Sequence, residues 1–176
     1  MRQRYNAVLL LVLLALTGYY VAFETSGEGP GEGKKVKRGT PIYLLEPWNV
    51  AGLRVEAHDG RELFCERVEG GAWSVRKGKE NENLSGIVDD FVGSLLATVE
   101  IDKTAVEGQD LCDFGFDSPA FTITLTDVTN KTYQLFLGDS TPGGTCLYAR
   151  FADAHQILIV GALLDWELKK LDPLMS

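Results

Sequence analysis

Few residues in this chain have the types and spacings that enzyme chemistry requires. Asp113, Phe114 and Gly115 spell the metal-binding triplet of protein kinases, but no catalytic-loop motif accompanies it and 176 residues leave no room for two lobes. The glycine turn at 138–145 approaches a phosphate-binding loop, yet Gly144 stands where such a loop needs its lysine, and a strand pattern follows it. Neither motif therefore indicates nucleotide chemistry.

The acid–base candidates are isolated from one another. The only two histidines, His58 and His155, lie in separate polar turns, so a metal site would need carboxylates from distant segments. Asp89 and Asp90 are adjacent on a predicted helix and point about 100° apart, a poor arrangement for paired acid and base catalysis. We expect all four to be replaceable surface residues. The sequence thus predicts a protein that is not an enzyme and uses no cofactor or metal.

Three cysteines, Cys65, Cys112 and Cys146, are widely separated and form no CxxC pair, so neither a zinc ribbon nor a thioredoxin-type centre is indicated. An extracytoplasmic location would permit one disulfide. Cys65 falls within a strand pattern and is expected to be a small buried side chain. Cys112 and Cys146 lie beside predicted loops, which makes them the candidate disulfide pair.

The N-terminus has the pattern of a membrane anchor. Residues 5–23 are uncharged and mostly Leu, Val and Ala, and a helix of this length, rising ~1.5 Å per residue, nearly covers a hydrocarbon core of ~30 Å. Arg2 and Arg4 precede the stretch and Glu24 follows it, which predicts a cytoplasmic N-terminus and an extracytoplasmic remainder. A cleaved signal peptide is the alternative, but small residues at the spacing for cleavage are missing. We expect residues 1–23 to be an uncleaved, single-pass anchor in the inner membrane.

Beyond the anchor the chain changes composition twice. Residues 24–40 are rich in glycine and charge, which predicts a flexible tether, and residues 41–176 have the length of one extracytoplasmic domain. The chain holds 17 basic and 25 acidic residues, and two of the basic ones precede the anchor. So acidic a domain is a poor partner for nucleic acid or for anionic lipid, because both require neutralisation of phosphates.

The first half of the predicted domain has a β meander followed by a helix. Apolar residues alternate with polar ones over 51–76, with turns at Asp59–Gly60 and at Gly70–Gly71. Apolar residues then recur at helical spacing over 84–96, with Asn83 as the expected N-cap. A short strand is expected at 98–101. The helix has an apolar face that must cover a sheet.

The second half has four strand patterns and a second helix. We expect a hairpin over 121–137, a longer turn at 138–145, strands at 146–151 and 156–160, and a terminal helix at 162–171. This order predicts an α+β fold with a largely antiparallel sheet packed by one or two helices. Six residues should be buried together in its core: Trp73, Phe91, Leu95, Phe121, Ile123 and Leu135.

The second half also resembles a bacterial family known as domain of unknown function 4340. The resemblance rests on Phe114-Gly115-Phe116-Asp117 with Pro119, on the strand FTITL, on Gly138-Asp139, on Tyr148-Ala149-Arg150 and on ILIV. Trp73 and the helix to Leu96 extend it upstream, so that it covers roughly residues 52–172. Gly115, between two aromatic residues, indicates a position where a Cβ would clash or φ is positive. Members of this family are single-span envelope proteins, often encoded near gliding-motility-type ABC transport components.

These observations predict a non-enzymatic, membrane-anchored envelope protein that acts through protein contacts, as an accessory or scaffold subunit of a membrane complex. Interface energy concentrates in a few aromatic and Arg side chains, which makes Tyr148 and Arg150 the candidate contact residues. The alternative is a carbohydrate-binding or polysaccharide-export accessory domain. It would require Trp48, Trp73 or Tyr148 to form an exposed cluster of stacking rings.

Overall fold

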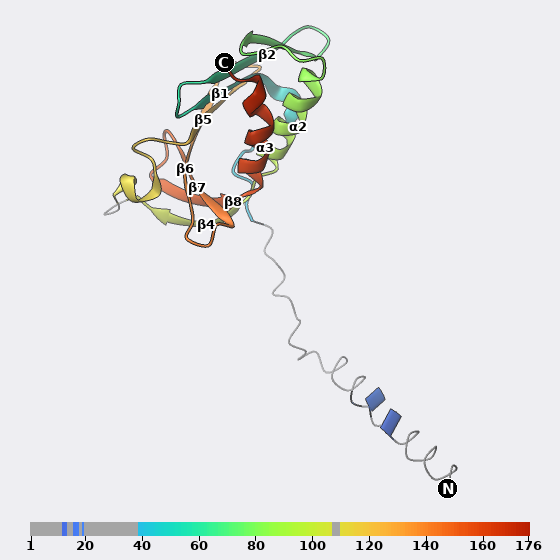
Figure 1. The fold of residues 1–176 in the computed structure, drawn as a ribbon, viewed down its shortest axis with the longest axis vertical. Helices are drawn as coiled ribbons and strands as arrows, with labels where there is room; N and C mark the ends of the chain where they lie inside the picture. The colour runs from blue at the N-terminus through green and yellow to red at the C-terminus, as the bar shows by residue number, and fades with distance from the viewer. Residues whose placement is uncertain (1–11, 14–15, 18, 20–38, 107–109) are drawn as a thin grey trace. The chain divides into compact units, whose positions relative to one another are not determined.

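In a computed structural model of the chain, the described residues are 12–13, 16–17, 19, 39–106 and 110–176. The chain divides into two compact units, Met1–Arg38 and Gly39–Ser176, and every strand and helix labelled in Figure 1 belongs to the second. The predicted anchor and tether lie largely outside the described residues. Among the residues that are described, none belongs to a helix with the length and apolar character needed to cross a bilayer.

The second unit is an α+β domain built on one antiparallel sheet of eight strands. The strands are β1 (Val50–Ala57), β2 (Glu62–Arg67), β3 (Trp73–Lys77), β4 (Glu100–Ala105), β5 (Phe121–Asp127), β6 (Thr132–Ser140), β7 (Cys146–Phe151) and β8 (Gln156–Gly161). The helices are α2 (Leu84–Leu96) and α3 (Leu163–Leu171), with short 3-10 helices η1 (Pro47–Asn49), η2 (Leu111–Phe114) and η3 (Asp172–Leu174). The predicted fold class is confirmed for this domain.

Two meanders meet in the middle of the sheet. The strand order is β3-β2-β1-β5-β6-β7-β8-β4, so β1 pairs with β5 and the two meanders extend outward from this pair. After α2 the chain crosses to the far edge, where β4 pairs with β8. The sheet curves around α2 and α3, which lie side by side on its concave face (Figure 1). Hence one face of the sheet is covered by helices.

Helix α2 has the bounds that its periodicity predicts. Its buried residues, Leu84, Val88, Phe91, Val92, Leu95 and Leu96, recur at helical spacing and form one stripe. Asn83 occupies the N-cap position, but its side chain makes no capping hydrogen bond. Packing of the apolar stripe therefore stabilises this helix, and its first turn gains nothing from the expected cap.

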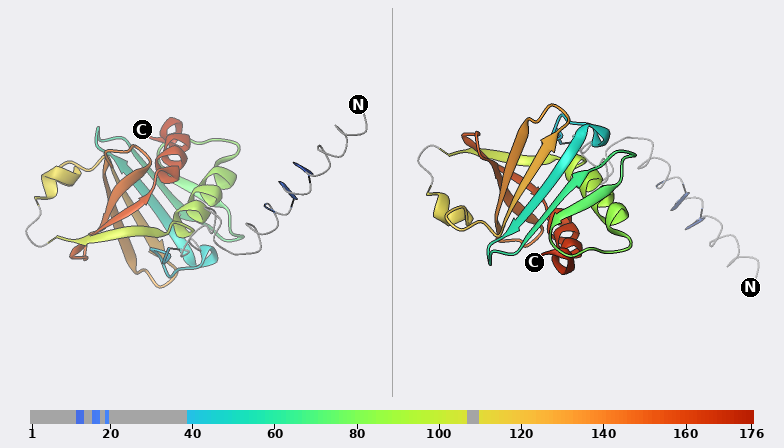
Figure 2. Two further views of the ribbon diagram at one scale, coloured as in Figure 1. Left: turned by 90° about the horizontal axis from the view of Figure 1, so that it is seen from below. Right: turned by 90° about the horizontal axis from the view of Figure 1, so that it is seen from above.

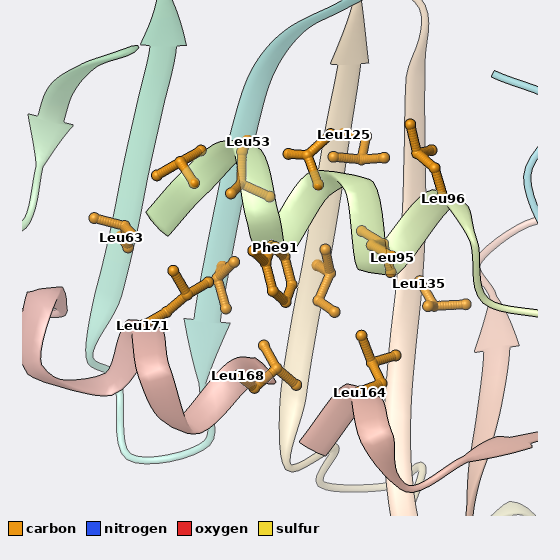
Figure 3. Packing of buried hydrophobic residues seen from close by; sticks show 14 of the residues in the cluster. Leu53, Leu63, Phe91, Leu95, Leu96, Leu125, Leu135, Leu164, Leu168 and Leu171 are labelled. Atoms are coloured by element: carbon orange, nitrogen blue, oxygen red, sulfur yellow. The ribbon is translucent and has the colours of Figure 1, made fainter. Parts of the chain in front are cut away.

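The core lies between the helices and the concave face of the sheet. Phe91 is 1% exposed, and its ring points from α2 toward Leu168 and Leu164 of α3 (Figure 3). Five of the six residues expected in the core are buried: Trp73, Phe91, Leu95, Ile123 and Leu135. The sixth, Phe121, is half-buried and packs at the margin of the cluster. Phe121 is the first residue of β5.

Two expectations about the elements were wrong in detail, and the burial of α3 could not be read from its sequence. The strand expected at 98–101 is instead β4, which begins at Glu100 and runs to Ala105. The turn expected at 138–145 is shorter, because β6 continues through Ser140. Helix α3 buries Leu164, Leu168 and Leu171 and leaves the apolar Leu163 and Trp166 exposed. Helical spacing identifies apolar residues but does not tell which of them a neighbour covers.

Candidate functional site

The motifs that carry the family resemblance converge on the face of the sheet opposite the helices. Side chains alternate along a strand, and Leu147 and Ala149 of β7 belong to the helix-side core. Tyr148 and Arg150 therefore point to the other, outer face. The η2 segment lies on that side of the sheet, away from α2 and α3 (Figure 2). Segments some 30 residues apart in sequence thus form one surface.

Close backbone contact explains the two glycines in these motifs. Gly115 ends η2 with φ of 76°, and a Cβ there would lie 2.7 Å from Cγ of Asp139. A Cβ on Gly138 would lie 2.0 Å from the carbonyl oxygen of Phe114. The expectation for Gly115 is confirmed on both counts, since its φ is positive and a side chain would clash. These contacts seat η2 against the end of β6.

Aromatic side chains fill the space between η2 and the sheet. The rings of Phe114 and Tyr148 meet edge to face with centroids 4.9 Å apart, and the Phe114 and Phe116 rings are stacked at 6.5 Å. The Arg150 guanidinium carbon lies 6.0 Å from the centroid of the Phe116 ring and 5.8 Å from that of Phe136. We call these five residues, Phe114, Phe116, Phe136, Tyr148 and Arg150, the outer-face cluster. The structure therefore brings both predicted contact residues together.

Arg150 differs from the other arginines that the structure describes. Arg54, Arg61, Arg67 and Arg76 each form an ion pair with Asp or Glu, at 2.6 to 2.9 Å. Arg150 forms none with any described residue, and its buried Nε has no hydrogen-bond partner. Two ring faces attract the cation, but neither satisfies its N–H donors. Arg150 thus has no carboxylate partner among the described residues.

A shallow hollow of about 380 Å³ borders the same segment. It lies between the β1–β2 turn, with His58 and Arg61, the loop before β5, with Ser118, and the end of β6, with Asp139. The Ser118 hydroxyl and Nδ1 of His58 are 2.9 Å apart, a contact that sequence reasoning did not find because 60 residues separate the two. Both side chains are exposed, and the hydrogen bonds in the described structure include no third group that orients the imidazole. The pair joins two loops and lacks the arrangement of a catalytic triad.

The thiols are poorly suited to nucleophilic chemistry. Asp110 raises the pKa of the Cys112 thiol by accepting its hydrogen bond, and further aspartates nearby act in the same direction. Burial raises the pKa of Cys65 to about 11, and Cys65 is buried as expected. Cys112 is exposed and Cys146 half-buried, both as free thiols, and the pairing between them stays a prediction. A neutral thiol is a weak nucleophile and a weak metal ligand.

Asp89 has a structural role that was not expected. Its Oδ1 accepts hydrogen bonds from the indole Nε1 of Trp73, at 2.8 Å, and from Arg67, at 2.9 Å. The Arg67 guanidinium also lies 4.5 Å from the centre of the Trp73 ring. Asp89 is exposed as expected, but it is bonded to two side chains and is not merely a replaceable surface residue. Asp90, like His155, is exposed.

The rings considered for carbohydrate stacking occupy different environments. Trp73 is 5% exposed and Tyr148 packs against Phe114, whereas Trp48 is 69% exposed on η1. Across the part of the chain that the structure describes, no three His, Cys, Asp or Glu side chains converge in a way that would hold a metal ion. Among the described residues, the outer-face cluster is therefore the best candidate for a functional site.

Comparison with known proteins gives one match. A family model described as domain of unknown function (DUF4340) matches residues 85–172, half of the chain. The match includes the whole outer-face cluster and excludes the first meander, with Trp73. Neither a curated protein nor a solved structure matches the sequence.

Proposed function

We propose that this chain, which belongs to the DUF4340 family, is a non-enzymatic, membrane-anchored envelope protein that binds another protein. In this proposal it serves as an accessory or scaffold subunit of a membrane complex, of the kind associated with ABC transport. Residues 5–23 anchor it in the inner membrane with the N-terminus in the cytoplasm, and residues 41–176 act outside. The composition of the N-terminus supports the anchor.

The observation that carries the proposal is that Arg150 forms no ion pair with any described residue. In a chain with a net charge of −8, acidic partners are plentiful, and the four other described arginines of the domain have one. Arg150 is instead held between Phe116 and Phe136. A guanidinium fixed in this way has lost much of its conformational entropy before binding, so less is lost when a partner binds. Because Nε is buried, we infer that a carboxylate of the partner pairs with the Nη groups of this half-buried guanidinium.

Tyr148 completes the proposed contact. Tyr148 is half-buried, and its ring packs edge to face with Phe114. The ring is therefore rigid but still accessible to a partner. Rigid Tyr and Arg side chains beside one another are typical of the residues that dominate interface energy. The raised thiol pKa values and the isolated His58–Ser118 pair support binding over catalysis.

The test compares Arg150→Ala with Arg76→Ala in the full-length protein. Arg76 is an exposed arginine on β3 that pairs with Glu66, far along the sheet from the cluster. Crosslinking in intact membranes, followed by pull-down, should recover partners with the wild type and with Arg76→Ala. It should recover few with Arg150→Ala, whose melting temperature should stay near that of the wild type.

Two outcomes would contradict this assignment. Unchanged recovery from Arg150→Ala would show that the cluster is not the contact, and joint loss of recovery and of thermal stability would make Arg150 a structural residue. Topology is tested separately by protease treatment of spheroplasts, which should digest the domain and spare the N-terminus. Protection of the domain until the inner membrane is lysed would refute the extracytoplasmic location.

A further inference from the structure

An apolar surface that no described residue covers lies where the first described segment of the domain joins the sheet. Leu163 is 64% exposed, Trp166 56% and Ile101 58%. Leu163 and Trp166 are three residues apart on α3 and therefore lie on one face of the helix. Leu163 and Ile101 line an open groove of about 280 Å³, whose other apolar walls include Ala97, Val99 and Leu164 and whose lining also contains Ser94 and Thr98. We call Ile101, Leu163, Trp166 and this groove the α3 face.

The charges beside the α3 face are paired with one another. Lys169 lies 2.7 Å from Asp165, and Lys170 lies 2.9 Å from Glu167. The Lys170 ammonium also lies 3.7 Å from the centre of the Trp166 ring. Along α3, the exposed surface therefore presents Leu163, then Trp166, and then Lys169 and Lys170, whose charges are neutralised by ion pairs. Trp and Lys side chains of this kind are enriched where proteins meet the interface of a bilayer.

Backbone pairing fixes where the chain enters the domain. The Glu100 N–H donates to the Thr40 carbonyl at 2.8 Å, the Ile42 N–H donates to the Thr98 carbonyl at 3.0 Å, and Pro41 pairs with Val99. Val99 is itself a wall of the groove. The chain before Gly39 thus joins the domain beside the α3 face, and that preceding sequence contains Lys34, Lys35, Lys37 and Arg38.

The length of the preceding sequence limits how far this entry point can lie from a bilayer. A glycine-rich linker of the length of residues 24–38 has an r.m.s. reach of about 20 Å. A domain of this size is about 35 to 40 Å across. If residues 5–23 are anchored as proposed, a bilayer within this reach can contact the side of the domain at the entry point more readily than the opposite side.

From these observations we propose that the α3 face docks on the surface of the phospholipid bilayer in which the chain is anchored. The contact is apolar and aromatic, so an acidic domain can make it without anionic lipid. This inference rests on the proposed anchoring, and it assigns an orientation in which Ile101, Leu163 and Trp166 enter the headgroup region.

The experiment uses the full-length protein reconstituted into phosphatidylcholine vesicles with brominated acyl chains. Flotation measures anchoring, and quenching of tryptophan emission by bromine measures docking. Bromine should quench the wild type. Most of that quenching should disappear in Trp166→Phe and remain in the matched control Trp48→Phe, since Trp48 is 69% exposed but lies outside the α3 face. Leu163→Ser should reduce quenching without reducing flotation.

The outcomes separate docking from anchoring. Flotation without bromine quenching of the wild type would overturn the docking proposal and leave the anchor intact. Quenching lost in Trp48→Phe instead of Trp166→Phe would show that another face meets the bilayer. Shielding of Trp166 from soluble acrylamide without bromine quenching would mean that a protein, such as a second copy, covers the face. Absence of flotation would overturn anchoring and docking together.

Discussion

Replacing Phe91 by Ala tests whether helix α2 packs in the core against both α3 and the sheet. The ring is 1% exposed and lies between α2, α3 and the sheet, so its removal leaves a cavity with walls from all three (Figure 3). Deleting a fully buried Phe side chain costs about 3 to 5 kcal/mol in the free energy of unfolding. Domains are stable by about 5 to 15 kcal/mol in total, so the variant should fold but with much of its margin lost.

That loss of stability is large enough to measure by melting. For a domain of this size, 1 kcal/mol corresponds to about 3 °C, so Phe91→Ala should lower Tm by about 10 to 15 °C. The assay is thermal unfolding of the full-length protein in detergent, followed by near-UV circular dichroism. Leu163→Ala is the matched control, because it removes an exposed apolar side chain and should change stability by less than about 0.5 kcal/mol.

The result that would refute this reasoning is a small effect. A decrease in Tm of less than about 3 °C for Phe91→Ala would mean that the ring is not enclosed by α3 and the sheet. A comparable decrease for Leu163→Ala would mean that the α3 face is covered within the protein itself, which would also contradict the docking proposal.

Three further predictions follow from the hydrogen bonds of buried side chains. The buried Tyr43 hydroxyl has no hydrogen-bond partner among the described residues, and burial raises its pKa. Tyr43→Phe should therefore raise the free energy of unfolding by about 1 kcal/mol, measured by urea denaturation. Asp89→Ala leaves the Trp73 indole N–H unpaired and should cost about 1 to 3 kcal/mol, whereas Asp90→Ala should change little in the same assay. Hydrogen bonds from Lys77 and then Arg54 lower the pKa of the buried Glu62, so its ionised form stabilises the fold above pH 4.5, and this contribution is lost as the pH falls through the lowered pKa. Glu62→Gln should therefore melt lower than the wild type at pH 7, and the difference should shrink in acid; a difference independent of pH would contradict the assignment.

Local sequence patterns determined much of the secondary structure. The stripe from Leu84 to Leu96 predicts α2 with the observed bounds, because burial of one helical face imposes its period on the residues. Alternation along Phe121 to Leu125 likewise predicts β5. The role of Gly115 could be inferred from its sequence neighbours alone, because glycine is required where two backbone segments touch. Family membership can also be recognised from the sequence, because the matching motifs occur in the family's order and spacing.

Only the tertiary structure decided which of those residues act together. Arg150 and Arg76 look alike in sequence, yet the arrangement of strands gives Arg76 a carboxylate partner and gives Arg150 none among the described residues. Leu163 and Leu164 are neighbours of the same type, yet α2 and the sheet cover one and leave the other exposed. Both outcomes depend on contacts between segments far apart in the chain. Local periodicity records that a side chain is apolar or charged, whereas its partner is set by the order in which strands pair and helices pack.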